Sequence, residues 1–465
     1  MAQSVSLTST GEAKSPISFV AQIRALFQNL ATLTILLLVF PINAAIVLVS
    51  LFCNRLSRFF RPEAAVAANR KNILINGAKM TKALQLARSF HAAGHRVILI
   101  ETHKYWLSGN RFSNAISRFY TTPTPQYDLE AYIQALIDIV KKENIDVYVP
   151  VASVAENYYD SLAKPALSEH CEVFHFDADI TQMLDDKFAF SEKARAFGLS
   201  VPKSFKITNP EQVLNFDFSG ETHKYILKSI PYDSVRRLAL TKLPCDTPEE
   251  TAALVKNLPI SPEKPWIMQE FIRGKEFCTH STVKNGELQL HCCSESSAFQ
   301  VNYENVENLK IQEWVRHFVK ELGITGQISF DFIEAEDGTV YAIECNPRTH
   351  SAITMFYNHP QVADAYLSEE VFTEPLQPLP NSKPTYWTYH EIWRLTGIRS
   401  FAQLQTWIHN FLRGTDAIYK LDDPLPFLMV HHWQIPLLLL NNLRQLKGWT
   451  MIDFNIGKLV ELSDY

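Results

Sequence analysis

The chain has 465 residues, which is too long for one ordinary domain, so we expect two to four. Hydrophobic residues make up 46% of it, enough for several cores, which excludes wholesale disorder. The net charge of -5 gives no basic field and disfavours nucleic acid as a partner. The seven cysteines are odd in number and include no Cys-x-x-Cys pair, so we expect reduced thiols in a cytosolic compartment.

An uncharged apolar segment lies near the N-terminus. Residues 25–54 carry no charge, and about 20 apolar residues are enough to cross a bilayer. Pro41 interrupts the segment, which also permits a surface-lying arrangement, and a helix packed on a domain is a further alternative. Basic flanks tend to stay cytoplasmic. We therefore interpret residues 1–70 as a membrane-associating segment that holds the chain at the cytoplasmic face of a membrane, with its flank at Arg55, Arg58 and Arg61.

Residues 71–180 have the pattern of a parallel α/β domain. A short apolar strand at 72–76 ends in Gly77, a helix is expected over 79–93, and a second strand follows at 97–100. Another amphipathic helix and strand are expected at 128–144 and 147–150. The first turn has a single glycine, so the glycine-rich fingerprint of dinucleotide-binding folds is absent and a nicotinamide dehydrogenase is disfavoured.

Residues 181–360 have the pattern of an α+β domain. A helix begins at Lys187, strands are expected at 225–229 and 266–271, and two hairpins turn at Asn285-Gly286 and Asp337-Gly338. Residues 361–465 are first rich in proline and aromatic residues and then apolar, without a chemical motif. We interpret them as a C-terminal extension that packs on the core or touches the membrane.

The second hairpin carries the strongest chemical signal. It brings Asp331 alongside Glu344, and Asn346, two residues further on, faces the same side of the strand. Such oxygen ligands, completed by phosphates and water, suit Mg²⁺. Arg348 follows and can neutralise charge on a transferring phosphoryl group. Alternation points Cys345 away from this face, so we expect it in the core.

Two weaker signals precede this hairpin. Lys187 begins a helix and Lys228 ends a strand, in apolar settings. The segment Glu270-Phe271-Ile272 then leads into a turn, and Glu276 follows it. Main-chain groups at such a hinge can pair with an adenine edge, and an acid can accept hydrogen bonds from ribose hydroxyls, although either feature alone is common.

In this order, the three signals resemble the ATP-grasp superfamily between about residues 72 and 351. The resemblance implies a pre-ATP-grasp α/β domain followed by an ATP-grasp fold of two α+β subdomains. It further implies that ATP and Mg²⁺, or Mn²⁺, are bound. For the nucleotide, the resemblance implies phosphate and adenine contacts for Lys187 and Lys228, base binding by the backbone of Glu270, Phe271 and Ile272, and ribose binding by Glu276. For the metal and the transferring group, it implies metal binding by Asp331, Glu344 and Asn346, and stabilisation of the phosphoryl group by Arg348.

One stretch departs from the family pattern. Family members usually have a glycine-rich loop after the second lysine, but residues 229–244 contain no glycine. Arg236 and Arg237 lie there and are candidate cationic clamps. His350 and Ser351, just past the metal strand, are candidate contacts to the acceptor substrate, and a purely structural role is an equal alternative for both.

Over nearly its whole length the chain also resembles the cyanobacterial mycosporine-glycine synthases, which are ATP-grasp ligases that make an ultraviolet sunscreen. This resemblance implies phosphorylation of a cyclohexenone, 4-deoxygadusol, and its condensation with glycine. A ligase acting on a carboxylate, a carboxylating enzyme and a non-catalytic nucleotide-binding module stay open as alternatives. The residues behind the resemblance are the uncharged N-terminal segment, 76–79, 232–237, 431–436 and 455–460.

Overall fold

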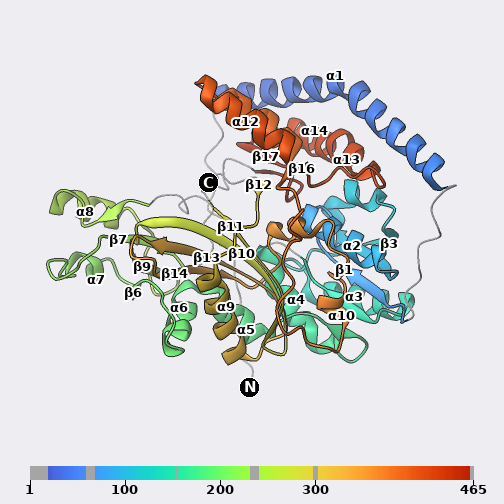
Figure 1. Ribbon diagram of the computed structural model, residues 1–465. Helices are drawn as coiled ribbons and strands as arrows, with labels where there is room; N and C mark the ends of the chain where they lie inside the picture. Colours follow the sequence, from blue (N-terminus) through green and yellow to red (C-terminus); the bar gives the residue numbers. More distant parts are fainter. Residues whose placement is uncertain (1–18, 59–68, 152–153, 231–239, 297–301, 461–465) are drawn as a thin grey trace.

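The computed structural model describes residues 19–58, 69–151, 154–230, 240–296 and 302–460. A long N-terminal helix crosses one edge of the molecule, and a parallel α/β unit and two antiparallel sheets form its body (Figure 1). The C-terminal part of the chain returns to the α/β unit and lies between that unit and the long helix. The chain is therefore a mixed α/β and α+β protein, as the sequence predicts.

The α/β unit is a five-stranded sheet with the order β3-β2-β1-β4-β5, in which all neighbouring strands are parallel. Its core strands are buried on both faces, which explains their continuous apolar runs. The predicted helix at 128–144 is confirmed, with Asp128 as N-cap and Asn144 as a left-handed C-cap. The elements are β1 (Asn72–Ile75), α2 (Thr81–Ala92), β2 (Arg96–Thr102), η1 (His103–Tyr105), η2 (Gly109–Phe112), β3 (Ile116–Thr122), α3 (Leu129–Glu143), β4 (Val147–Val149), α4 (Val154–Leu167), β5 (Glu172–Val173) and α5 (Ala178–Asp185).

Two antiparallel four-stranded sheets follow. The smaller has the order β6-β9-β7-β8 and the larger β11-β10-β13-β14. The predicted strands at 225–229 and 266–271 are confirmed as β7 and β9, and they pair with each other. The elements are α6 (Lys187–Ala196), β6 (Ser204–Ile207), α7 (Glu211–Leu214), β7 (Tyr225–Ser229), β8 (Lys242–Leu243), α8 (Pro248–Lys256), β9 (Trp266–Glu270), β10 (Gly274–Lys284), β11 (Glu287–Glu295), α9 (Leu309–Leu322), β13 (Gly326–Ala335) and β14 (Val340–Asn346).

Both predicted hairpins are present in the larger sheet. Asn285 and Gly286 have φ angles of 52° and 80°, the left-handed values that a two-residue turn between β10 and β11 requires. The turn at Gly338 joins β13 to β14. An aromatic core holds α6 and α9 against this sheet; it contains Phe190, Trp314, Phe318, Phe330 and Phe332.

The C-terminal part is mostly helical and packs on the α/β unit. Arg88 of α2 is buried and donates to Asp423 over 2.8 Å, and the amide of Thr81 donates to the carbonyl of Asn455 over 2.8 Å. The elements are β12 (Asn302–Tyr303), η3 (Ser351–Phe356), α10 (Asp364–Leu367), β15 (Thr385–Tyr386), α11 (Thr388–Arg394), η4 (Leu395–Gly397), α12 (Phe401–Arg413), β16 (Thr415–Asp416), α13 (Leu425–Met429), η5 (Val430–Gln434), α14 (Ile435–Gln445), β17 (Met451–Asp453) and β18 (Lys458–Val460).

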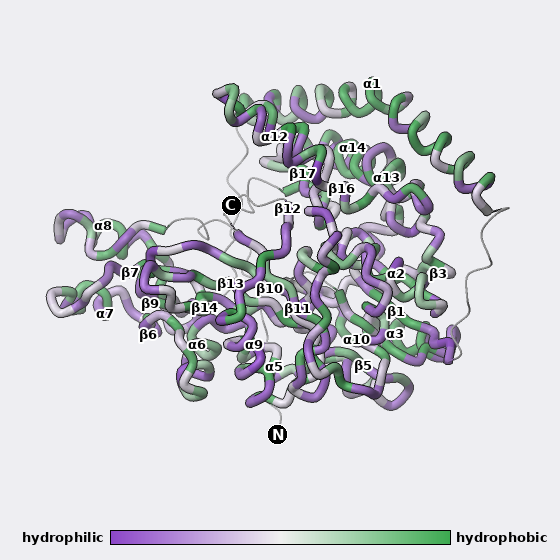
Figure 2. The backbone as a smooth tube through the Cα atoms, viewed as in Figure 1, coloured by the Kyte–Doolittle hydropathy of each residue, from purple (hydrophilic) through white to green (hydrophobic). Residues whose placement is uncertain are grey.

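The N-terminal apolar segment forms α1 (Phe19–Arg58), which contains Pro41 and contacts α13, η5 and α14. Figure 2 shows that α1 is hydrophobic along most of its length. Within the described residues, α1 is the single helix that is long and apolar enough to cross a membrane, judged by length and composition alone.

Candidate active site

The hairpin of β13 and β14 sets the geometry of the site. Asp331 lies directly opposite Glu344 in the antiparallel register, and the amide of Asn346 donates to Asp331 over 3.3 Å. The neighbouring residues Phe330 and Cys345 point into the core, so the alternation along both strands leaves the oxygen-bearing side chains on the other face. The three predicted metal-binding side chains therefore converge.

The two lysines approach this hairpin from separate elements. The ammonium group of Lys187, at the start of α6, lies 3.3 Å from Glu344. Asp186 caps this helix by accepting from two backbone amides, which fixes the position at which Lys187 leaves the chain. Lys228, near the end of β7, donates to Gln269 over 3.2 Å and is electrostatically coupled to Glu344.

The charges in the cluster shift one another's ionisation. Burial and the adjacent Glu344 carboxylate raise the pKa of Asp331 to about 7. Burial also acts to raise the pKa of Glu344, but the neighbouring cations, above all Lys187, outweigh it and hold that pKa below its ordinary value. Burial lowers the pKa of Lys228, although the carboxylates oppose this. The carboxylates of Asp331 and Glu344 therefore lie close enough to repel each other, and a bound divalent cation would reduce this repulsion.

This donor set fits a magnesium ion that also binds phosphate. It has two facing carboxylates and an amide, and Mg²⁺ characteristically takes few protein ligands and keeps positions for phosphates and water. Among the described residues, no group of three or more His, Cys, Asp or Glu side chains is arranged as an all-protein metal site. The three side chains therefore suit a metal ion whose remaining ligands come from a nucleotide and water.

The hinge after β9 has most of its polar groups engaged. The amides of Glu270 and Phe271 donate to the carbonyls of Lys203 and Lys224, and the Glu270 carboxylate contacts His223 over 2.7 Å. Within the described part of the chain, the amide of Ile272 has no such partner. Glu276, on β10, is exposed and is electrostatically coupled to Lys228.

The residues that follow β14 contact β10 and the C-terminal part of the chain; they include Arg348, His350 and Ser351. Arg348 is electrostatically coupled to Asp331, Glu344 and His350. The amide of His350 donates to a ring nitrogen of His280 over 3.3 Å. Burial, with the nearby cations, lowers the pKa of His350 to about 3, so this ring is neutral. Ser351 donates to the side chain of Asn455, over 2.8 Å.

Several residues at this location escaped the sequence analysis. Lys82 of α2 is buried, and its ammonium group donates to the carbonyl of Thr349 over 2.7 Å. The Nε2 of His280 and the hydroxyl of Thr349 are buried without a hydrogen-bond partner among the described residues. Asp185, just before α6, is coupled to Arg348, and burial raises its pKa. None of these residues lies in a recognisable motif, and the sequence around Lys82 predicts only an ordinary lysine in a helix. Arg236 and Arg237 lie outside the described residues.

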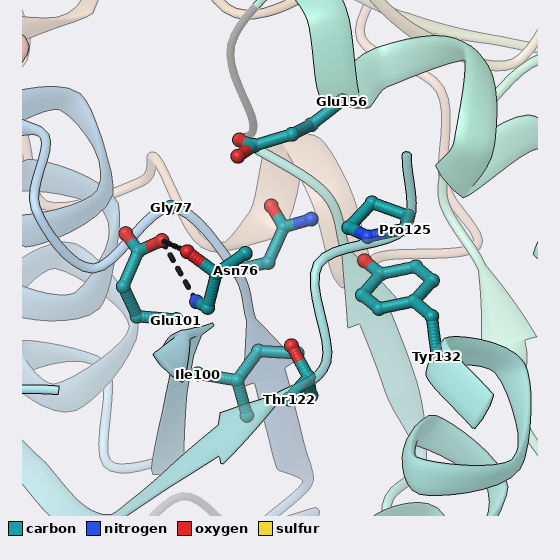
Figure 3. Close-up of a pocket in the computed structure, with 9 residues that line it drawn as sticks. Asn76, Gly77, Ile100, Glu101, Thr122, Pro125, Tyr132 and Glu156 are labelled. Carbon is teal, nitrogen blue, oxygen red and sulfur yellow. Dashed lines mark hydrogen bonds between the residues drawn. The ribbon is translucent and has the colours of Figure 1, made fainter. Parts of the chain in front are cut away.

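A small pocket opens at the carboxyl ends of the parallel strands, where ligands bind in open α/β sheets (Figure 3). The buried Lys79 lies beside it, 3.3 Å from Glu101 and 3.6 Å from Glu156. Lys79, Glu156 and Arg348 all act on the pKa of Lys82, which burial lowers well below its ordinary value. Lys82, which donates to the carbonyl of Thr349, is therefore close both to this pocket and to the end of β14. The pocket is lined by Asn76, Gly77, Ile100, Glu101, Thr102, Thr122, Pro125, Tyr132 and Glu156.

A family model described as an ATP-grasp domain matches residues 184–352, which contain the whole cluster. No curated protein matches the chain. Among solved structures, the ADP complex of N5-carboxyaminoimidazole ribonucleotide synthetase superposes with a TM-score of 0.51 at 15% identity. The superposition covers 70% of this chain and 82% of the synthetase chain. An L-amino acid ligase from Bacillus licheniformis has a TM-score of 0.44 at 18% identity, with 60% and 67% covered. Residues 184–352 match an ATP-grasp domain, and the likeness to the solved synthetase shows the same fold.

Proposed function

We propose that the chain is an ADP-forming ligase that phosphorylates 4-deoxygadusol with ATP and condenses the product with glycine to give mycosporine-glycine. The observation that carries the ligase proposal is the convergence of two lysines and Arg348 on the paired carboxylates Asp331 and Glu344. The choice of cyclohexenone and glycine rests on the whole-chain resemblance to mycosporine-glycine synthases.

In this proposal Asp331, Glu344 and Asn346 hold Mg²⁺, or Mn²⁺, against the triphosphate. The bound metal supplies charge neutralisation for the phosphate oxygens. Lys187 and Lys228 would contact phosphates, and the ion pair of Lys187 with Glu344 would have to open for that carboxylate to serve as a metal ligand. The amide of Ile272, which donates to no carbonyl among the described residues, donates to the adenine edge beside the carbonyl of Glu270, and Glu276 accepts from the ribose.

The reaction has two steps. The enolate oxygen of the deprotonated cyclohexenone attacks the γ-phosphorus, the bond to the β-phosphate oxygen breaks, and ADP leaves with the released electron pair. The glycine amine then adds to the ring carbon of this vinylogous acyl phosphate, phosphate leaves with the C–O electrons, and the amine loses its protons to water or a base. Arg348 stabilises the transferring phosphoryl charge, and the chain's main contribution is positioning.

We propose that the acceptor lies between Arg348 and α2, beside Lys82. Lys82 is buried, and burial with the neighbouring cations lowers its pKa well below its ordinary value, so an anionic enolate oxygen beside it would favour its protonated form. The buried Nε2 of His280 and hydroxyl of Thr349 are available to the same ligand. His350 is neutral, with a pKa of about 3, and therefore orients groups rather than accepting the ammonium proton of glycine. Ser351, Arg236 and Arg237 stay candidate contacts to substrate or phosphate.

We also propose that the protein works at the cytoplasmic face of a membrane, attached through residues 25–54. The support is the apolar character of α1 and the arginines that follow it.

The decisive assay supplies ATP and Mg²⁺ with 4-deoxygadusol and a panel of amino acids, and records both ADP release and the near-ultraviolet spectrum. The proposal requires ADP release that depends on both acceptors, with a new chromophore. A matched pair of variants isolates the site: Glu344→Gln removes a metal ligand, while Glu336→Gln removes an exposed acid at the turn of the same hairpin. Only the first should stop turnover.

Other outcomes would replace the proposal. ADP release with a carboxylic acid and an amino acid, without a chromophore, would indicate an amide-forming ligase. Dependence on bicarbonate would indicate a carboxylating enzyme. Nucleotide binding without ADP release for any acceptor would indicate a non-catalytic nucleotide-binding module.

A further inference from the structure

The long helix α1 has an unusual arrangement for a surface helix: its polar side chains between Gln28 and Asn54 mostly face the protein, beside the buried Leu36 and Val47, while most of its apolar side chains face outward. Asn29, Asn43 and Ser50 are buried, at spacings that keep them on one side of the helix. Of the residues between Leu26 and Cys53 that are exposed, all are apolar or cysteine apart from Thr34, whose hydroxyl donates to the carbonyl of Leu30. The outer face therefore offers no polar side chain that needs water.

The inner face is hydrogen-bonded to the C-terminal part at points along most of the helix. Near one end, Gln28 and Asn29 donate to the carbonyls of Trp449 and Lys447 over 2.8 and 3.0 Å. In the middle, the amide of Asn43 lies 2.5 Å from the hydroxyl of Tyr389 and 2.7 Å from a ring nitrogen of His432. Near the other end, Ser50 and Asn54 bond to Tyr419 and to the carbonyl of Leu421.

These contacts decide between a helix that spans a membrane and one that lies in its surface. The hydrogen-bonded stretch from Gln28 to Asn54 is about 39 Å long at 1.5 Å per residue. The hydrocarbon core of a bilayer is about 30 Å thick. A spanning helix would detach from the C-terminal part over this stretch, so Asn29 would keep only its bond to the carbonyl of Ala25 within the helix, and the amide of Asn43 would lose both of its partners to lipid.

We infer that α1 is a monotopic membrane anchor: it stays docked on the protein and lies in the plane of one leaflet, with its apolar face in the lipid. The occupant of that face is a lipid surface because the face is continuous, uncharged and bounded by arginines at both ends, Arg24 and Arg55, which suit anionic headgroups. In the view of Figure 1, α12 lies at the same edge of the molecule, and it exposes Phe401 and Leu412. This inference rests on the proposed membrane attachment and not on the ligase activity.

Site-directed spin labelling measures the depth of the helix directly. Leu26, Leu37 and Leu48 are spaced by 11 residues, close to three full turns, so they share a face, and they are 36%, 71% and 65% exposed. Each is changed to cysteine in full-length protein in which Cys53, Cys171 and Cys245, the cysteines that are not buried, are serine. The labelled proteins are bound to vesicles of phosphatidylcholine and phosphatidylglycerol.

An anchor in the plane places all three labels at one shallow depth. A spanning helix places Leu37 near the bilayer centre and the other two near opposite headgroup regions, because about 16 Å of helix separates neighbouring labels. The second pattern overturns the inference while leaving membrane attachment intact.

Flotation on the same vesicles tests the occupant. Leu37→Gln/Leu48→Gln should lower the vesicle partition coefficient about tenfold or more, whereas Leu240→Gln/Leu309→Gln, which alters exposed leucines elsewhere, should not. If the unaltered protein fails to float and instead forms dimers that the first pair of changes dissociates, the face binds a second copy, and both the anchor and the membrane proposal are wrong. Failure to float without dimers also refutes both.

Discussion

Replacing Glu344 by alanine separates catalysis from stability. The carboxylate is 33% exposed, and its partner Lys187 is 3.3 Å away and partly exposed. Partly exposed ion pairs of this kind contribute at most about 1 kcal/mol to folding. The change also removes a like charge beside Asp331, which offsets part of that loss. We therefore expect the free energy of unfolding to change by less than about 1 kcal/mol.

The effect on the reaction is expected to be much larger. If Glu344 holds the metal that neutralises the triphosphate, its loss removes preorganised charge stabilisation worth about 3–4 kcal/mol in the transition state. At about 1.4 kcal/mol per factor of ten, kcat falls by roughly 10²–10³. The assay is ADP release at saturating ATP and acceptor, with thermal unfolding measured on the same samples and Glu336→Ala as the matched control. Wild-type turnover in a folded Glu344→Ala protein would remove the metal assignment.

Three further predictions follow from the same contacts. Since the pKa of Asp331 is about 7 and the metal needs the carboxylate, Mg²⁺ affinity measured by calorimetry should fall about tenfold per pH unit below 7, with proton release on binding. An affinity that is flat between pH 6 and 8, or an unchanged slope in Asp331→Asn, would contradict this. Lys228→Met should raise the KM for ATP about 10-fold or more with little change in unfolding temperature, because the ammonium group of Lys228 faces the site. An unchanged KM would refute the proposed contact between Lys228 and the phosphates. Arg88→Met should destabilise the protein by about 3–5 kcal/mol in denaturant unfolding, since it strands the buried Asp423; a loss under about 1 kcal/mol would mean that water reaches this pair.

Local patterns were enough to predict the framework of the site. The Asp-Gly turn between β13 and β14 and the alternation along β14 are each determined within a few residues, so the facing of Asp331 and Glu344 followed from the sequence. The acceptor side was not predictable in this way. Lys82 and Thr349 are separated by 267 positions, and only the packing of α2 against the hairpin turns an ordinary helical lysine into a buried one.

The same distinction applies to α1. Its composition predicts contact with a membrane, but composition does not reveal that its few polar residues lie on one face and are met by carbonyls more than 300 positions away. The helical content of the C-terminal part also escaped the sequence analysis, because prolines and aromatic residues mask its periodicity until tertiary contacts fix the helices.

A short stretch of chain, from Trp449 to Asn455, contacts both α1 and the candidate active site. At Trp449 the backbone accepts from Gln28 of α1, and six residues later Asn455 accepts from Ser351 and from the amide of Thr81. The intervening strand β17 contacts His390, whose ring lies against Phe454. Because these contacts are partly buried and follow one another along the chain, α1 is part of the folded body and not a detachable tether. Its removal would expose the apolar side chains of α13 and α14 and loosen the segment that contacts Ser351, so α1 and the candidate site belong to one packed structure.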